Sequence, residues 1–165
     1  MSEKLVVYFS CTGTTKELAE KLAKVTGGDL FEIKPKEEYT DSDLNWRDKS
    51  SRSSLEMNDK FSRPEILDKV NNMEDYDTVF LGFPIWWYTA PRIIDTFLES
   101  YDFSNKKIIV FCTSGGSGIG NTISDLKPSC SSDAKWLEGK RFPSNVSISE
   151  LEEWVNSLKE WNLWK

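Results

Sequence analysis

The chain has 165 residues, a length that fits one domain with a sizeable buried core. Apolar residues make up 38% and charged residues 29%, a globular composition that excludes a disordered or fibrous chain. The net charge of −6 disfavours direct nucleic-acid binding, because the neutralisation of phosphates needs a basic face. An acidic surface instead suits a basic protein partner.

Two residue types narrow the chemistry further. Histidine is absent, which excludes Ser-His-Asp and Cys-His catalysis and the usual histidine zinc sites. Cys11, Cys112 and Cys130 form no Cys-x-x-Cys pair, so we expect neither a disulfide framework nor a metal site. No apolar run reaches the roughly 18 residues of a transmembrane helix. Because residues 1–4 lead directly into a strand-like run, we expect no signal peptide and a cytoplasmic location.

The first third of the chain is predicted to form a strand, a helix and a second strand. Residues 5–9 are a continuous apolar run, typical of a strand buried on both faces. Apolar residues between 18 and 23 then repeat with helical spacing, Gly27 and Gly28 end that helix, and residues 29–34 resemble a strand. Residues 36–63 show no sustained period. Since most connections have about 4–6 residues, we expect this insertion to be functional or mobile.

Helices and strands alternate again after the insertion. Pro64 opens a predicted helix with apolar residues at 66, 67 and 70, and residues 77–83 form a third buried strand. Pro91 opens another helix, and residues 107–112 form a fourth strand. A glycine-rich turn, a short helix and a weaker fifth strand over 134–142 follow. Ser149 is the predicted N-cap of the last helix, with Glu152 completing a capping box.

This alternation predicts a single α/β domain over residues 1–165, with helices on both faces of a doubly wound parallel sheet in three layers. Ligands of such sheets bind beyond the carboxyl ends of the strands, at the topological switch point. The turns after the first, third and fourth strands therefore carry most weight for function.

The turn after the first strand is Ser10-Cys11-Thr12-Gly13-Thr14-Thr15. It places four hydroxyls and several backbone N–H groups at a helix start, where the helix dipole favours an anion. Ordinary helix capping by serine and threonine is the alternative. The turn matches neither the Walker A pattern nor Gly-x-Gly-x-x-Gly, so a phosphate monoester fits better than a dinucleotide.

The other two turns supply aromatic rings and glycines. Three consecutive aromatic residues, 86–88, lie between Pro84 and Pro91, and rigid indoles beside a phosphate site favour stacking on a planar ring system. A buried aromatic corner or a protein contact patch is the alternative. In the turn over 113–120, four glycines allow backbone N–H groups to approach a ligand, although a flexible loop has the same composition. The coincidence of all three turns at one sheet edge favours a binding site.

Together these turns resemble those of the flavodoxin family. Ser10-x-Thr12-Gly13-x-Thr15 is similar to its FMN-phosphate loop, Pro84-Ile-Trp-Trp to its first ring-flanking loop, and Thr113-Ser-Gly-Gly-Ser-Gly118 to its second. The likeness covers nearly the whole chain, and the insertion, with Asp43-Leu-Asn-Trp46 and Ser50-Ser-Arg-Ser-Ser54, resembles a bacterial subgroup of FMN proteins. The resemblance implies a five-stranded parallel sheet in the order 2-1-3-4-5, with FMN at the switch point.

The resemblance also implies a set of cofactor-binding residues and no catalytic or metal-binding ones. The FMN phosphate would be held by the residues of the first turn, Ser10, Thr12, Gly13, Thr14 and Thr15. The isoalloxazine would be lined by Pro84, Ile85, Trp86 and Trp87, with Trp87 favoured for stacking. The third turn would contribute Thr113, Ser114, Gly115, Gly116 and Gly118, the last four presenting backbone groups to the polar edge of the ring.

Three functions remain open at this stage. The first is an FMN-binding electron carrier that docks to a basic reductase or acceptor, and the second is an NAD(P)H-dependent FMN quinone reductase acting on small acceptors. The third, a phosphate-ligand module without flavin, is disfavoured by the tandem tryptophans. Many family members carry a glycine near the position of Tyr88, so we expect weak stabilisation of one-electron-reduced flavin here. Neutral and acidic surroundings should also lower the flavin potential.

The insertion offers a lid and cations to this site. Trp46 would close over the flavin or, alternatively, anchor the long loop to the core. Arg47, Arg52 and Arg63 would meet an anionic substrate or the reduced flavin, or form only a solvated face.

Overall fold

The computed structural model describes residues 3–114 and 118–160, and its centre is one five-stranded parallel sheet. The strand order β2-β1-β3-β4-β5 confirms the predicted topology. The strands are β1 (Lys4–Tyr8), β2 (Asp29–Glu32), β3 (Thr78–Pro84), β4 (Lys107–Thr113) and β5 (Lys135–Phe142). In the register of β1, Leu5 lies opposite Asp29 on one side and Val79 on the other. The chain winds in opposite directions from β1 and β3, so the switch point lies between these two strands.

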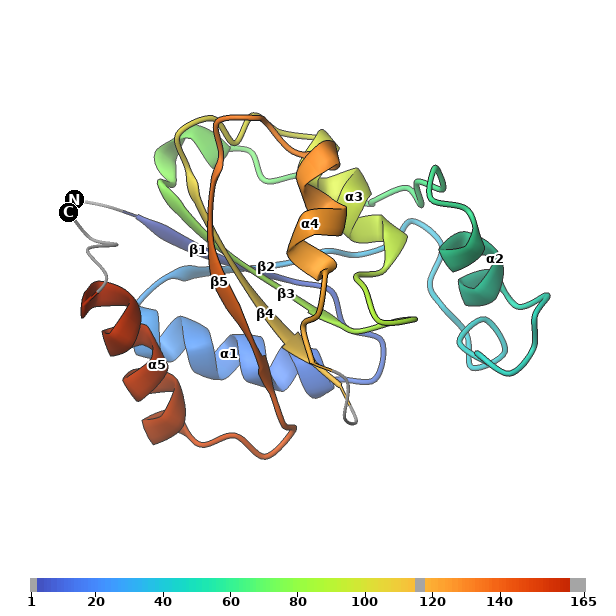
Figure 1. Cartoon of the computed structure of the whole chain (residues 1–165), viewed down its shortest axis with the longest axis horizontal. Helices are drawn as coiled ribbons and strands as arrows, with labels where there is room; N and C mark the ends of the chain where they lie inside the picture. Colours follow the sequence, from blue (N-terminus) through green and yellow to red (C-terminus); the bar gives the residue numbers. More distant parts are fainter. Residues whose placement is uncertain (1–2, 115–117, 161–165) are drawn as a thin grey trace.

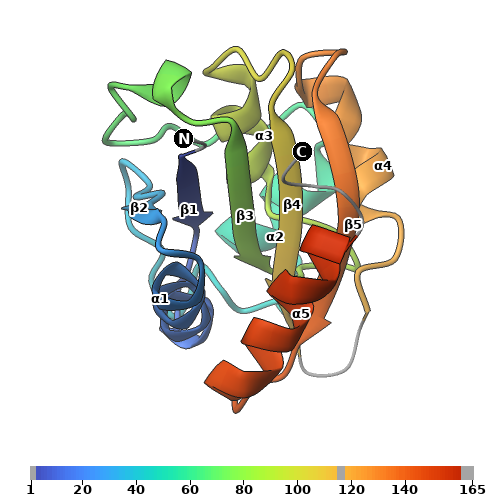
Figure 2. The same cartoon turned by 90° about the vertical axis from the view of Figure 1, so that its left-hand side faces the viewer.

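Helices cover both faces of the sheet and confirm the three predicted layers (Figures 1 and 2). The helices α1 (Thr14–Thr26) and α5 (Ile148–Glu160) lie on one face, and α3 (Arg92–Glu99) and α4 (Thr122–Leu126) lie on the other. The short helix α2 (Arg52–Asn58) stands apart from the sheet, beyond the carboxyl ends of its strands (Figure 1). No helix within the described ranges has the length and apolar character needed to cross a membrane.

Alternation of side chains along the central strands builds two cores. In β3, Val79, Leu81 and Phe83 pack in the core under α3 and α4, whereas Phe80 packs in the core under α1 and α5. All four side chains are fully buried. Because both faces of the sheet are covered, the sequence of this strand is continuously apolar and does not alternate between apolar and polar residues.

Residues 64–70 do not form the predicted helix. Instead, Pro35 and Ile66 pair in an antiparallel bridge, in which Lys36 N–H donates to the Glu65 carbonyl at 2.9 Å and Leu67 N–H donates to the Lys34 carbonyl at 2.8 Å. These backbone groups therefore find partners on the segment that follows β2. Leu67 is exposed, so its apolar character does not mark a core-facing helix stripe here.

The last helix begins two residues earlier than predicted. Its first residue is Ile148, and Glu150 N–H donates to the Ser147 hydroxyl at 3.1 Å, which makes Ser147 the capping residue. The predicted cap, Ser149, lies inside the first turn. Both serines have a glutamate three residues downstream, so the capping-box pattern fits either one.

The insertion is attached to α3 as well as to the end of β2. Arg92 of α3 donates to the Met57 carbonyl at 2.8 Å, near the end of α2. Arg63 forms a two-pronged ion pair with Glu99, at 2.8 and 3.2 Å. These contacts fix the insertion beside the carboxyl end of the sheet, where the predicted binding turns lie.

Candidate functional site

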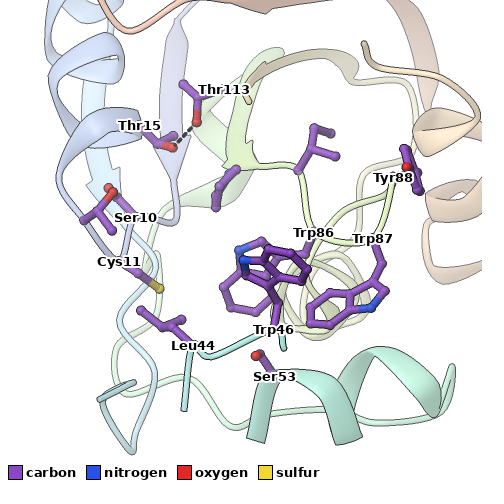
Figure 3. A pocket seen from close by; sticks show the side chains of 13 residues that line it. Ser10, Cys11, Thr15, Leu44, Trp46, Ser53, Trp86, Trp87, Tyr88 and Thr113 are labelled. Atoms are coloured by element: carbon purple, nitrogen blue, oxygen red, sulfur yellow. Dashed lines mark hydrogen bonds between the residues drawn. The ribbon is translucent and has the colours of Figure 1, made fainter. Parts of the chain in front are cut away.

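The turn between β1 and α1 is held in one conformation by its own side chains. Gly13 is the N-cap of α1 with φ of 94°, a left-handed value that favours glycine. Its N–H donates to the Ser10 hydroxyl at 3.1 Å. The hydroxyls of Thr15 and Thr113 lie 2.8 Å apart, and this hydrogen bond joins the start of α1 to the end of β4 (Figure 3). The positive end of the helix dipole is thereby presented at the carboxyl edge of the sheet.

The turn after β3 is a tight two-residue loop. Trp86 and Thr89 exchange both backbone hydrogen bonds, at 2.8 and 3.0 Å. The two central residues, Trp87 and Tyr88, have φ of 48° and 65°. A turn of this kind requires positive φ at both central positions and usually contains asparagine and glycine. Two aromatic residues with positive φ store backbone strain at the tip of this turn.

The two consecutive tryptophans have different environments. The Trp86 ring packs edge-on against Phe9 and Tyr39, with centroids 5.8 and 5.5 Å apart. Trp87 is 41% exposed and sits on the strained turn. Trp86 is thus anchored to the core, whereas the more accessible indole is that of Trp87, the residue favoured by the sequence for stacking.

These turns and the insertion enclose a cavity of about 900 Å³, a size typical of small-molecule sites. The insertion contributes three lining residues, Leu44, Trp46 and Ser53, which all lie in the two segments that resemble the bacterial subgroup. Trp46 is 65% exposed, and its indole lies at the same end of the cavity as those of Trp86 and Trp87, away from the threonine pair (Figure 3). The described lining residues carry no charged side chain.

The cavity brings together most of the predicted site residues from the first two turns. Its lining includes Ser10, Thr12, Thr15, Pro84, Ile85, Trp86, Trp87 and Thr113. Gly13 and Thr14 shape the first turn without lining the cavity themselves. Gly118 is exposed and does not line it, and the predictions at 115 and 116 lie outside the described residues.

The end of β4 is fixed by a cation that the sequence analysis missed. Arg141 of β5 donates from Nη2 to the Ser114 carbonyl at 2.8 Å and from Nε to the Ser114 hydroxyl at 3.2 Å. Ser114 is half-buried and does not line the cavity. The arginine therefore positions the first residue after β4, from which the glycine-rich turn starts.

A polar cluster behind the cavity was also missed. Arg52 forms an ion pair with Glu56 at 2.9 Å, donates to the Glu37 carbonyl at 2.8 Å and stacks 3.8 Å from the Tyr39 ring centroid. The Tyr39 hydroxyl donates to Glu56 at 2.5 Å, and burial raises the tyrosine pKa. The cluster joins α2 to the ring that supports Trp86. Arg52 and Arg63 each form an ion pair within the protein. This favours a structural role for them over the predicted contact with an anionic substrate or the reduced flavin.

Burial also suppresses ionisation of the cysteines. It raises the pKa of the Cys11 thiol and of the Cys112 thiol from 9 to about 12 in each case. Cys11 lines the cavity, yet at neutral pH it is a protonated and weakly nucleophilic thiol. Within the described ranges, no group of three or more carboxylate or thiol side chains is placed to bind a metal ion.

Because of these thiols, the free energy of unfolding should fall as the pH rises above about 9. Because the folded state retains the two protons to a higher pH than the unfolded chain, their contribution is full below about pH 9 and is lost as the pH rises towards 12. Each thiol can lower the free energy of unfolding by up to about 1.4 kcal/mol per pH unit in that window. Urea unfolding between pH 8 and 11 measures this slope, and Cys112→Ala should reduce it. A slope unchanged by that substitution would contradict the assignment to Cys112.

Known proteins share this architecture. A family model described as Flavodoxin matches residues 3–158. A candidate flavoprotein from Bacteroides eggerthii is 46% identical, with a TM-score of 0.90 over 96% of this chain and 99% of that one. A second, from Bacteroides uniformis, is 43% identical, with a TM-score of 0.89 over 94% and 98% of the two chains.

A more distant structure has a named ligand. The flavoprotein from Lactobacillus acidophilus, solved in complex with FMN, is 24% identical, with a TM-score of 0.66 over 94% of this chain and 99% of that one. At this identity the likeness concerns the fold. A search of curated proteins finds no match. The extent of the family match and the two Bacteroides structures lead to one conclusion: the chain belongs to the flavodoxin family.

Proposed function

We propose that this chain is a redox protein that binds FMN in the cavity between β1, β3 and the insertion. One observation carries the proposal: a single cavity joins a hydroxyl-rich helix start to a group of three tryptophans. The first suits a phosphate group and the second suits a planar ring. The FMN complex of the L. acidophilus flavoprotein, which has the same fold, supports this proposal.

The residues present fit such a cofactor. Ser10, Thr12 and Thr15, in the turn that Gly13 shapes at the start of α1, would hold the phosphate without a fixed positive charge. Pro84, Ile85, Trp86 and Trp87 would line the ring, and the turn that begins at Ser114 would meet its polar edge. When bound, FMN supplies the redox chemistry, because its ring system takes up and releases electrons.

The chain's own contribution is to orient the ring and to set its surroundings. Trp46 would cover the ring from the insertion, while Trp86 is held by its contacts with Phe9 and Tyr39. Because the described lining is uncharged, it would give little stabilisation to a negatively charged reduced flavin. We therefore expect a reduction potential below that of free FMN, which a redox titration measures.

Flavin binding tests the proposal directly. The purified protein should retain FMN through desalting, and riboflavin, which lacks the phosphate, should bind at least about 100-fold more weakly, as expected for the loss of two charge-assisted hydrogen bonds. Gly13→Ala should weaken FMN and leave riboflavin nearly unchanged, because the added Cβ meets no atom within 4 Å but is strained at positive φ. Gly27→Ala, which is also strained at positive φ and meets no atom within 4 Å but lies at the opposite end of α1, is the matched control and should leave both affinities unchanged. Equal affinities for FMN and riboflavin would contradict a phosphate site, and no retained flavin would refute the proposal.

Reduction of a small acceptor is the second candidate function, as in an NAD(P)H-dependent quinone reductase. It is favoured by the exposed Trp46 and Trp87, which leave one end of the cavity open to a small molecule. The alternative is an electron carrier whose acidic surface docks to a basic partner protein. Oxidation of NAD(P)H by a quinone in the presence of the purified, FMN-loaded protein alone should be fast for the reductase and negligible for the carrier.

A further inference from the structure

A second cavity lies beside the first and shares two of its walls. Its volume is about 620 Å³, and it is lined by Trp46, Arg47, Lys49, Ser54, Asn58 and Trp87. Trp46 and Trp87 line both cavities, and the adjacent Ser53 and Ser54 line one each. The two indoles therefore separate the uncharged space proposed for the flavin from a space that contains two cationic side chains.

The cations of this second cavity are available to a ligand. Within the described part of the chain, neither Arg47 nor Lys49 forms an ion pair, whereas Arg52 and Arg63 each have a carboxylate partner. Asp48 lies between them in the sequence but does not line the cavity. Two unpaired cations in one cavity of a protein with a net charge of −6 form a local exception to its acidic surface.

The segment that carries these cations is held by hydrogen bonds and a ring contact. Arg47 N–H donates to the Asn45 side chain at 3.2 Å, and the guanidinium lies 5.0 Å from the Trp46 ring centroid. The Ser54 hydroxyl donates to the Asp48 carbonyl at 2.8 Å, which ties this segment to α2. The Arg47 guanidinium is thus held beside the Trp46 indole, and Lys49 lies two residues further along the same segment, an arrangement that suits a ligand with both a ring and a negative charge.

We propose that this second cavity binds the anionic group of a planar redox substrate whose ring lies against Trp46 and Trp87. The shared chemistry is an aromatic ring with a sulfonate, carboxylate or phosphate, as in an acidic quinone or a nicotinamide dinucleotide. Arg47 and Lys49 neutralise the anion, and the Asn58 side-chain amide donates a hydrogen bond to it. The proposal rests on the proposed flavin function, because FMN in the adjacent cavity would take electrons from a reduced nicotinamide or pass them to a quinone.

Calorimetric titration of the oxidised, FMN-loaded protein tests the proposal without relying on turnover. The ligands are 1,4-naphthoquinone-2-sulfonate, neutral 1,4-naphthoquinone and NADP+. The double variant Arg47→Gln/Lys49→Gln should weaken at least one of the two anions by about tenfold or more, since each lost cation removes a charge-assisted contact. Its affinity for neutral naphthoquinone should be unchanged. The anion that is weakened identifies the substrate source.

A charge-matched control separates a local site from the general field. Lys24→Gln/Lys135→Gln removes two exposed cations elsewhere and gives the same net charge. It should leave all three affinities unchanged, and in the unmodified protein added salt should weaken only the anions. Equal affinity of each anion for the unmodified protein and both variants would overturn the proposal. Failure of the unmodified protein to retain FMN is scored before the titration and would refute the proposed function instead.

Discussion

Gly82→Ala is expected to lower the free energy of unfolding by about 3 kcal/mol, at the upper end of the usual cost of overpacking. A Cβ at this position of β3 would lie 2.2 Å from two atoms of the Phe111 ring. Phe111 is fully buried on β4 and packs in the core under α1 and α5, so its ring has little room to move. Chemical denaturation, with the midpoint and slope compared between the two proteins, measures the change.

The control for this prediction is Gly118→Ala. The added Cβ would meet no heavy atom within 4 Å, and φ is not in the left-handed region. We expect a change within about 0.5 kcal/mol of zero, in either direction. Equal effects of the two substitutions would show that the contact with Phe111 does not limit position 82.

Arg52→Ala should destabilise the fold by about 3 kcal/mol and weaken FMN binding. Removing the guanidinium leaves the Glu56 carboxylate, which is only 12% exposed, without its cation. It also removes the donor to the Glu37 carbonyl and the group stacked on Tyr39. Because Tyr39 supports the Trp86 ring, loss of this packing should spread to the cavity wall. Denaturation and FMN titration of the same variant measure both effects.

Lys36→Ala tests whether the loss of any ion pair of the insertion lowers stability and FMN affinity as Arg52→Ala does. Lys36 and Glu65 form an ion pair at 3.1 Å, but both side chains are well exposed. Exposed pairs contribute about 0.2–1 kcal/mol, so this variant should retain most of its stability and its full FMN affinity. If the two variants were equally stable, the partly buried cluster around Arg52 would have no special role.

The sheet was predictable because its central strands carry their information locally. Residues 5–9, 79–83 and 108–112 carry no polar side chain apart from the Tyr8 hydroxyl, and such continuous apolar runs require cover on both faces. The helix predicted from Pro64 was wrong, because nothing in its spacing reveals that Ile66 pairs with Pro35 on a distant segment. The cap of α5 was misplaced by two residues because two serines satisfy one local rule equally.

The candidate site divides in the same way. The hydroxyl turn and the tandem tryptophans are continuous in sequence, and the structure places residues of both in one cavity. The cluster of Tyr39, Arg52 and Glu56 joins residues up to 17 positions apart. Because the segment between them has no periodicity, no local sequence pattern predicts that they meet. Trp86 and Trp87 are identical neighbours in the sequence, and their different environments follow from the backbone conformation of the turn. The residue types alone do not predict that conformation.

The hydrogen bond from the Lys36 N–H to the Glu65 carbonyl means that the chain leaves the segment after β2 and returns beside it at nearly the same point. The two ends of the loop between these residues are held together. Its length therefore does not affect the positions of the strands, and the entropic cost of lengthening it grows only slowly. Mutation and length change can thus accumulate at the mouth of the cavity while the strand registers and the hydroxyl turn stay constant. The insertion can therefore change one wall and the entrance of the cavity without rebuilding the sheet.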